Sequence, residues 1–284
     1  MGAEERAPCA PEAPLLVFTD LDGTLLDHHG YGWQGAAAAL AALKERGAPL
    51  VFVSSKTRAE LLPLQEQMGL AGLPLVAENG GVVFVPPAWR DPLEATGGQI
   101  SFSPAGVVCL GAPYARVRQV FARLRQGYGA VGFGDMEAAE IAARTGLDLR
   151  SAARAKEREC SEPFVCHADV AVLKKAVASA GMTVTCGGRF FHLLAAGQDK
   201  GKAVRFLATL YAQMRKQPVL TIGLGDAPND LPLLRAVDIP VVVPRPDGSR
   251  LAWPEGRPRI APWAGSQGWG EAMIRLLAEL DGQS

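Results

Sequence analysis

Short apolar runs alternate with helix-forming stretches in the first eighty residues of the chain. Residues 15–20 (LLVFTD) form a continuous apolar run that ends in polar residues, which is typical of a strand buried in a parallel sheet. Residues 34–46 are rich in Ala and stop at Gly47, a residue type that commonly caps helix C-termini. The pattern then repeats, with a strand predicted at 49–55, a helix at 57–69 and a strand at 73–81. This alternation predicts an α/β fold with a doubly wound parallel sheet.

The pattern changes after Pro86 and Pro87, where Gly97, Gly98 and Pro104 interrupt any long periodicity. New helices are predicted near 114–126, 136–145, 149–159 and 169–180, followed by short strands at 182–185 and 190–194. A second, smaller α/β domain is therefore expected here, and we call it the cap.

The first pattern returns at Asp199, so the cap is expected to be an insertion into the core. The remaining elements are predicted as a helix to about Lys216, a strand at 218–223, a helix at 228–236, a strand at 239–243, a Pro/Gly-rich loop at 253–265 and a terminal helix to about Leu280. The predicted organisation is a flexible tail at 1–13, core at 14–86, the cap at 87–195 and the rest of the core at 196–284.

The balance of charges excludes several classes of protein. The chain has 284 residues with 29 basic and 29 acidic side chains, so its formal net charge is zero. A neutral total lacks the basic surface by which proteins bind nucleic acids, and we expect no nucleic-acid partner. Because 48% of the residues are hydrophobic, the chain can bury a real core and is not broadly disordered. Any anionic ligand must therefore be bound by a local cluster of residues.

The cysteines and the N-terminal segment predict the compartment. The five cysteines are odd in number and too widely spaced for a zinc knuckle, so we interpret them as reduced thiols. The N-terminal segment carries acidic residues and lacks the apolar stretch of a secretory signal. No run of eighteen apolar residues occurs, so we expect no membrane segment and a cytoplasmic protein.

Two groups of carboxylates follow predicted strands. Asp20 and Asp22 lie in DLDGT, directly after the first strand, where two acids one residue apart favour a hard divalent cation. An Asx turn at a strand exit is the alternative interpretation. Asp226 and Asp230 lie in GLGDAPND after a later strand, where Asp226 alone would also suit a helix N-cap. Carboxyl ends of parallel strands meet at one edge of a sheet, so both groups are expected in one crevice.

Two further residues are informative only together with these carboxylates. Ser54 lies at the end of the strand predicted at 49–55, and Lys200 begins a helix in GQDKGKA. By itself, a Ser after a strand is an ordinary turn residue, and a Lys in a first helical turn is an ordinary solvated charge that opposes the helix dipole.

The ordered set of DLDGT, Ser54, Lys200 in DKG, and GDAPND resembles the four motifs of the haloacid dehalogenase (HAD) superfamily of phosphohydrolases. The long insertion between the Ser and Lys motifs is similar to the type C2 cap of the Cof-like sugar phosphatases. Further strings resemble the mannosyl-3-phosphoglycerate phosphatase family, namely SKTR at 55–58, ENGG at 78–81, GFGDM at 132–136, EPF at 162–164 and GGRFFH at 187–192. The resemblance spans about 15–243 of the chain.

The resemblance implies a magnesium-dependent phosphatase. It implies Mg²⁺ held by Asp20, Asp226, the backbone carbonyl of Asp22 and, through water, Asp230. Asp20 would attack phosphorus to form an aspartyl-phosphate, and Asp22 would act as general acid and then as base. In addition, Ser54 and Lys200 would donate to the phosphoryl oxygens. The implied substrate is a phosphorylated sugar-glycerate, with mannosyl and glucosyl forms left open, and the product mannosylglycerate would be a compatible solute.

Several residues are candidates for binding the rest of the substrate. A guanidinium can grip a carboxylate with two hydrogen bonds, so Arg189 is a candidate for the glycerate, although a surface hairpin arginine is the alternative. Lys56 and Arg58 are candidates for the same anion, or they simply begin a helix. Glu78 and Asn79 are candidates for sugar hydroxyls, with a tight turn as the alternative, and so is Asp135, with a helix N-cap as the alternative. Asn229 in GDAPND is a further candidate. For His192, packing between strands is the preferred interpretation.

Three other functions stay open at this point. A general Cof-like sugar phosphatase shares the same motifs. A phosphomutase is disfavoured because its small helical cap would lie between the Asp and Ser motifs, where this chain has one helix. A catalytically silent ligand sensor would be expected to have lost the nucleophile, whereas Asp20, Asp22, Lys200 and Asp226 are all present. A monomer or weak homodimer without a membrane partner is expected.

Overall fold

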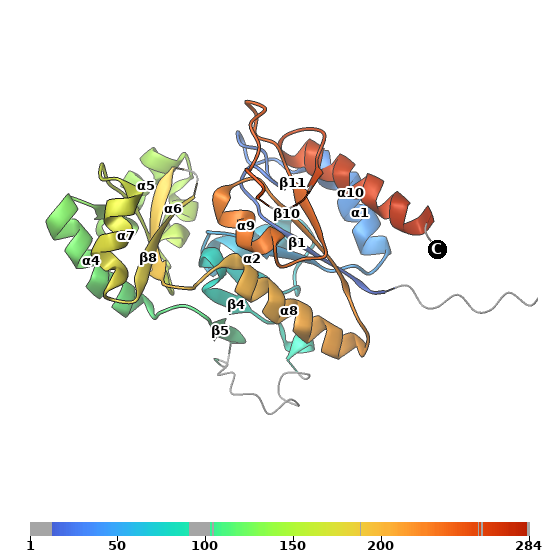
Figure 1. The fold of residues 1–284 in the computed structure, drawn as a ribbon, viewed down its shortest axis with the longest axis horizontal. Helices are drawn as coiled ribbons and strands as arrows, with labels where there is room; N and C mark the ends of the chain where they lie inside the picture. Colours follow the sequence, from blue (N-terminus) through green and yellow to red (C-terminus); the bar gives the residue numbers. More distant parts are fainter. Residues whose placement is uncertain are drawn as a thin grey trace, which may run out of the picture.

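The computed structural model describes residues 13–90, 103, 105–187, 189–254, 256 and 258–282. They form two sheets with their own helices, and Figure 1 shows them as a larger core and a smaller cap. The predicted tail at 1–13 lies outside the described residues except for residue 13. Among the described residues, no helix is both long enough and apolar enough to span a membrane.

The core contains an eight-stranded sheet in the order β12-β11-β10-β1-β2-β3-β4-β5. Its first six strands pair in parallel, and β4 and β5 pair antiparallel at one edge. The strands are β1 (Leu15–Thr19), β2 (Leu50–Val53), β3 (Leu75–Ala77), β4 (Val82–Phe84), β5 (Val107–Cys109), β10 (Leu220–Gly225), β11 (Ile239–Val242) and β12 (Arg259–Ile260). The core helices are α1 (Ala37–Glu45), α2 (Arg58–Gln67), α8 (Lys200–Arg215), α9 (Leu231–Leu234) and α10 (Gly265–Gly282).

Helices cover both faces of this sheet, which explains why its strands are apolar at nearly every position. Successive side chains of a strand point to opposite faces. Accordingly, Val17 packs with Trp269 of α10 in one apolar cluster, whereas Phe18 packs with Leu207 of α8 in another. In Figure 1, α1 and α10 lie together on one side of the sheet and α8 lies on the other. The predicted α/β fold with a mainly parallel sheet is therefore confirmed.

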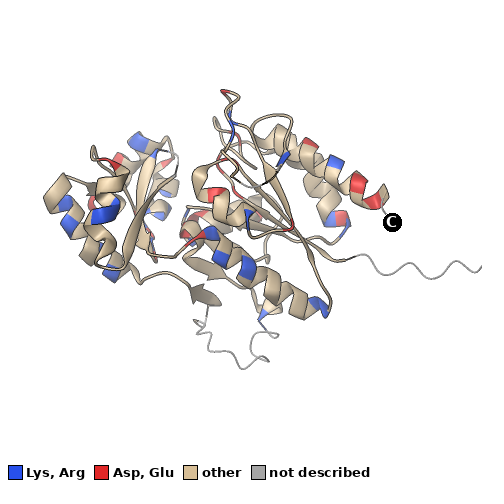
Figure 2. Cartoon of the chain, in the orientation of Figure 1, with Lys and Arg blue, Asp and Glu red and all other residues tan. Residues whose placement is uncertain are grey.

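The cap is built on an antiparallel sheet of four strands in the order β6-β7-β9-β8. Its strands and helices are β6 (Val131–Gly132), β7 (Ser161–Val165), β8 (Met182–Gly187), β9 (Phe190–Ala195), α4 (Tyr114–Tyr128), α5 (Ala138–Thr145), α6 (Leu149–Ala155) and α7 (Val170–Ala178). One face packs with α4 and α7 through Phe164, and the other with α5 and α6 through Val165 and Phe190. Figure 2 shows Lys and Arg on the cap helices and along α8 of the core. Asp and Glu lie on both the cap and the core.

Several elements differ from the sequence-based expectations. The strand predicted at 73–81 stops at Ala77, because Glu78 and Asn79 take left-handed backbone angles, with φ of 52° and 56°. No strand was predicted at β7, which contains Pro163, a residue type rare inside paired strands. The predicted loop at 253–265 contains β12. The domain boundary at residue 87 stays a prediction, and β5 beyond it pairs with β4 of the large sheet.

Candidate active site

Adjacent parallel strands bring the first two carboxylates together. The register of β1 and β10 places Thr19 beside Leu224, and the Asp20 N–H donates to the Leu224 carbonyl at 2.9 Å. Asp20 and Asp226 therefore leave neighbouring strands at the same sheet edge. The Thr24 hydroxyl donates to Asp226 Oδ1 at 3.0 Å, which fixes this carboxylate. Both acids are buried.

Lys200 is the cation at the centre of this site. Its ammonium lies 2.6 Å from Asp20 Oδ1 and 2.6 Å from Asp230 Oδ1. The Asp199 side chain caps the helix by accepting from the Lys202 N–H, so Lys200 becomes the first residue of α8. Gly80, with φ of 91°, lets the turn after β3 approach α8, because a Cβ there would lie 2.1 Å from the Asp199 carbonyl oxygen. The structure thus brings four predicted site residues, Asp20, Lys200, Asp226 and Asp230, into one cluster.

The carboxylates of Asp20, Asp226 and Asp230 form a candidate metal centre. Each offers an oxygen within 4.8 Å of the others, and Lys200 supplies one positive charge against three potential negative ones. Burial and the nearby Asp230 raise the pKa of Asp226 to about 6, and the same two causes raise the pKa of Asp20. A buried, oxygen-only cluster with excess negative charge fits a hard divalent cation such as Mg²⁺.

The raised pKa of Asp226 predicts that binding of Mg²⁺ depends on pH. In the metal-free protein, the raised pKa of Asp226 contributes stability that is fully present when the pH is below the ordinary pKa of an Asp carboxyl. This contribution is lost as the pH rises through about 6. A cation instead requires the ionised form and competes with the proton below that pH. We expect MgCl₂ to raise the melting temperature much more at pH 7.5 than at pH 5.

Thermal unfolding with and without MgCl₂ at both pH values measures this difference. Asp226→Asn is expected to lose most of the magnesium shift at pH 7.5. As a control, Asp247→Asn alters an exposed turn carboxylate and should keep it. Equal shifts at both pH values, or an undiminished shift in Asp226→Asn, would contradict the assignment.

Hydrogen bonds connect Ser54 with two asparagines, one of which, Asn229, precedes Asp230 in the chain. The Ser54 carbonyl accepts from the Asn79 N–H at 2.9 Å, and its hydroxyl accepts from the Lys56 N–H at 3.2 Å. The Asn79 side-chain oxygen accepts from the Asn229 amide at 3.1 Å, which joins the turn after β3 to η5 (Pro228–Asp230). The structure therefore connects all three predicted residues, although Ser54 and Asn79 are buried.

Asp22 lies at the entrance to the cluster and pairs with Lys56. The Lys56 ammonium lies 2.8 Å from Asp22 Oδ2 and 5.3 Å from the centre of the Tyr31 ring. Burial lowers the pKa of Lys56, but the attraction of Asp22 and Glu60 outweighs it, so the pKa lies above its ordinary value. Lys56 is therefore a firm positive charge beside Asp22.

A pocket of about 930 Å³ opens from these residues toward the cap. Core residues on its wall include Asp20, Asp22, Lys56 and Asn229. On the cap side, the wall includes residues that the sequence-based analysis did not single out as well as Arg189, whose guanidinium donates to the Thr145 carbonyl at 2.6 Å. Charged and aromatic wall residues that the sequence-based analysis missed include Arg158 of the cap and His28, His29, Tyr31 and Arg245 of the core.

Some of the missed residues carried a weak sequence signal. His28 and His29 follow DLDGT within five residues of its end, so their place near the first motif was available from the sequence. Arg245 lies just beyond β11 and its Nε approaches Asp226 Oδ2 at 3.8 Å. No local pattern marks Arg158, because it reaches the pocket only through the docking of cap and core.

Four candidates for substrate binding lie away from the pocket wall: Asn79, which binds Asn229 as described above, and three others. Asp135 accepts from the Gly132 N–H and forms ion pairs with Arg118 and Arg125 inside the cap. Arg58 Nε lies 3.0 Å from Glu159 Oε1 across the contact between core and cap. Glu78 is fully buried and binds cap residues. Their polar atoms are engaged in structural contacts. The N-cap role expected as the alternative for Asp135 is wrong, because Glu137 is the N-cap of α5.

Comparison with known proteins identifies the class. The haloacid dehalogenase-like hydrolase family matches over residues 17–91, which hold the Asp20 motif and Ser54. The chain belongs to this family of hydrolases.

Two relatives are similar to this chain over nearly their full length. Both are named glucosyl-3-phosphoglycerate/mannosyl-3-phosphoglycerate phosphatase. The protein of Persephonella marina is 37% identical over 94% of this chain and 98% of its own, and that of Methanococcoides burtonii is 38% identical over 93% and 97%. A crystal structure of a Thermoplasma acidophilum protein shares the fold, with a TM-score of 0.64 and 17% identity over 95% of this chain and 99% of that one.

Proposed function

We propose that this phosphatase hydrolyses mannosyl-3-phosphoglycerate and glucosyl-3-phosphoglycerate, releasing phosphate and the glycosylglycerate. The observation that carries the proposal is the identity of 37% to relatives of that name over nearly the whole chain. The arrangement of Asp20, Lys200, Asp226 and Asp230 at the end of a large pocket supports it, because a phosphate monoester needs local cations and a nucleophile at one place.

In the proposed reaction, Asp20 attacks phosphorus and forms an aspartyl-phosphate. Mg²⁺, when bound by Asp20, Asp226, Asp230 and the Asp22 carbonyl, neutralises phosphoryl charge as a Lewis acid. Lys200 lies 2.6 Å from Asp20, so its ammonium can hold the nucleophile and donate to a phosphoryl oxygen. The Ser54 hydroxyl is the second proposed donor. Together they orient the phosphoryl group in line with the Asp20 carboxylate.

Asp22 is the proposed general acid and base. The leaving sugar-glycerate oxygen is an alkoxide of high basicity, so it must receive a proton as it departs. Asp22 lines the pocket and is only half-buried, whereas Asp20 and Asp226 are buried, and this difference in exposure supports the assignment. It then takes a proton from the water that hydrolyses the aspartyl-phosphate.

The far wall of the pocket is the proposed site of the sugar-glycerate. The pocket volume of about 930 Å³ is large enough for a phosphorylated ligand the size of a disaccharide. Lys56 and Arg189 are the proposed partners of the glycerate carboxylate, and Asn229 that of a hydroxyl. Arg58, Glu78 and Asp135 are left out because their side chains are bound elsewhere, and Asn79 acts through Asn229.

A phosphate-release assay tests the proposal directly. The substrates are mannosyl- and glucosyl-3-phosphoglycerate, 3-phosphoglycerate, glucose 6-phosphate and mannose 6-phosphate, each with MgCl₂ or EDTA. We expect magnesium-dependent release, fastest by at least about tenfold in kcat/KM for the glycosylated phosphoglycerates, a difference of about 1.4 kcal/mol. Equal rates across the panel would favour a general sugar phosphatase. Binding without any release would favour the ligand sensor.

A further inference from the structure

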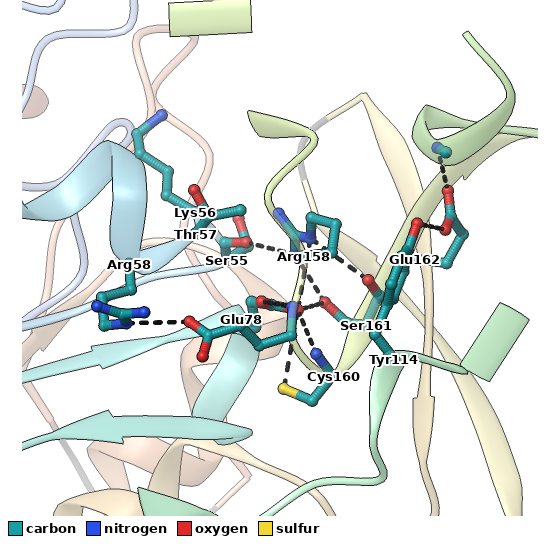
Figure 3. Close-up of polar contacts among 12 residues, drawn as sticks. Ser55, Lys56, Thr57, Arg58, Glu78, Tyr114, Arg158, Cys160, Ser161 and Glu162 are labelled. Atoms are coloured by element: carbon teal, nitrogen blue, oxygen red, sulfur yellow. Dashed lines mark hydrogen bonds and ion pairs between the residues drawn. The ribbon is translucent and has the colours of Figure 1, made fainter. Parts of the chain in front are cut away.

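Glu78 occupies an unusual position for a charged residue. It lies in the core turn η2 (Glu78–Gly80) after β3, is fully buried and has a left-handed φ of 52°. Its carboxylate points across to the cap, as Figure 3 shows. Oε1 accepts from the Glu159 N–H at 2.6 Å, and Oε2 accepts from the Cys160 N–H at 3.1 Å and the Ser161 hydroxyl at 2.7 Å. One core side chain thus binds three consecutive cap residues.

Arg158 joins this contact to the pocket. Its Nε lies 3.4 Å from Glu78 Oε2, and its Nη2 donates to the Ser161 hydroxyl at 2.6 Å and the Ser55 carbonyl at 3.0 Å. Arg158 is buried, with 2% of its side chain exposed, and it borders the pocket. The guanidinium therefore has its position set from the core by Glu78 and Ser55, and from the cap by Ser161.

Neighbouring contacts join core and cap at the same place. We call this interface, between the turns after β2 and β3 and the segment from α6 to β7, the seam. The Thr57 hydroxyl donates to the Arg154 carbonyl at 2.9 Å, and Arg58 pairs with Glu159. On the return to the core, the Gln198 amide donates to the Glu78 carbonyl at 2.8 Å. The segment from α6 to β7 is thus fixed to the turns after β2 and β3, which also carry Ser54 and Asn79.

Glu162 shows what a buried glutamate does without this bridging role. It is as fully buried as Glu78, and its carboxylate accepts from the Tyr114 hydroxyl at 2.6 Å and the Gly134 N–H at 2.9 Å. Arg118 lies 3.2 Å from it. All of these partners belong to the cap, so Glu162 stabilises the cap alone, and its loss should not change how cap and core meet.

We propose that Glu78 is a positioning residue of the substrate pocket, which holds Arg158 and the α6–β7 segment of the cap at a fixed place opposite Asp20. The inference rests on the proposed function, because the pocket wall matters only for a substrate that extends beyond its phosphate. The phosphoryl subsite consists of Asp20, Ser54 and Lys200, which Glu78 does not contact. Glu78 thus acts on recognition of the sugar-glycerate and not on the phosphoryl transfer itself.

Steady-state kinetics of Glu78→Gln and the matched control Glu162→Gln test whether Glu78 affects recognition of the sugar-glycerate without affecting phosphoryl transfer. Glutamine keeps the size of the side chain, but its amide nitrogen cannot accept hydrogen bonds. The substitution also removes the negative charge opposite Arg158. With mannosyl-3-phosphoglycerate, we expect the KM of Glu78→Gln to rise about tenfold or more. A rise of this size corresponds to the loss of hydrogen bonds to a charged group. With p-nitrophenyl phosphate, kcat and KM should stay near wild type. An unchanged KM for the long substrate, or an equal rise in Glu162→Gln, would overturn the proposal.

Labelling of Cys160 gives a readout that does not depend on activity. Its thiol is fully buried at the seam, whereas Cys186 is exposed and serves as the internal reference. Ser161→Ala removes one bond to Glu78 while keeping its charge, so it also tests the proposal if Glu78→Gln folds poorly. We expect iodoacetamide to label Cys160 several-fold faster, relative to Cys186, in Glu78→Gln and Ser161→Ala but not in Glu162→Gln.

The two experiments separate failure of this inference from failure of the proposed function. If wild type releases phosphate from neither substrate, the proposed function is wrong, and the labelling rates still decide whether Glu78 holds the seam closed. If wild type is active and Cys160 stays protected in both seam variants, the positioning role of Glu78 is wrong while the function stands.

Discussion

Replacing Asp20 by Asn is expected to lower kcat on order of 10⁴-fold or more, because the amide cannot form the aspartyl-phosphate. The fold should survive the change. Asn has nearly the same volume as Asp, and its carbonyl oxygen can still accept from Lys200, which lies 2.6 Å from Asp20 Oδ1. Its own burial and the nearby Asp230 raise the pKa of Asp20, so the ionised carboxylate is unfavourable there without metal. Because Asn removes this carboxylate from a cluster of three, the metal-free variant should melt no lower than wild type.

Phosphate release and thermal unfolding of the same preparation measure the two halves of this prediction. Rapid acid quench followed by mass spectrometry should also find a phosphorylated Asp20 peptide in wild type and none in the variant. Asp281→Asn makes the same change on the exposed end of α10 and should keep the wild-type rate. A variant with unchanged turnover would refute the covalent mechanism.

The sequence predicted the core more closely than the cap for a physical reason. Core strands covered on both faces are continuous apolar runs such as residues 15–20, which are visible without knowledge of their partners. The strand β7 carries Ser161, Glu162 and Pro163 and is paired only because β6 and β9 lie beside it. Such pairing is a tertiary effect that local propensity does not contain.

The same distinction applies to the site. Asp20 and Asp226 were expected in one crevice because parallel strands end at one sheet edge, and the structure places them there. Glu78 was a candidate for binding the substrate, but its carboxylate instead contacts cap residues that lie 81 to 83 positions further along the chain. A motif such as ENGG specifies the tight turn but not what its side chains meet.

Replacing Asp22 by Asn is expected to slow hydrolysis of mannosyl-3-phosphoglycerate roughly 10²- to 10⁴-fold, the usual worth of a general acid. In the structure, Asp22 Oδ2 binds Lys56 at 2.8 Å, while Oδ1 accepts no hydrogen bond from the described residues. That second oxygen is buried and is the proposed carrier of the proton to the leaving group. Nitrophenolate, by contrast, is a weak base that departs without a proton, so formation of the aspartyl-phosphate from p-nitrophenyl phosphate should stay fast in the variant.

Hydrolysis of the aspartyl-phosphate should remain slow in Asp22→Asn with either substrate, because Asp22 is also the proposed base for the attacking water. The variant is therefore expected to release a burst of nitrophenolate equal to the enzyme concentration and then turn over slowly, as stopped-flow absorbance would measure. The prediction separates the two roles of one carboxylate. A slow first turnover with p-nitrophenyl phosphate would mean that Asp22 mainly positions the phosphoryl group, and a normal steady state with the sugar substrate would remove it from the mechanism.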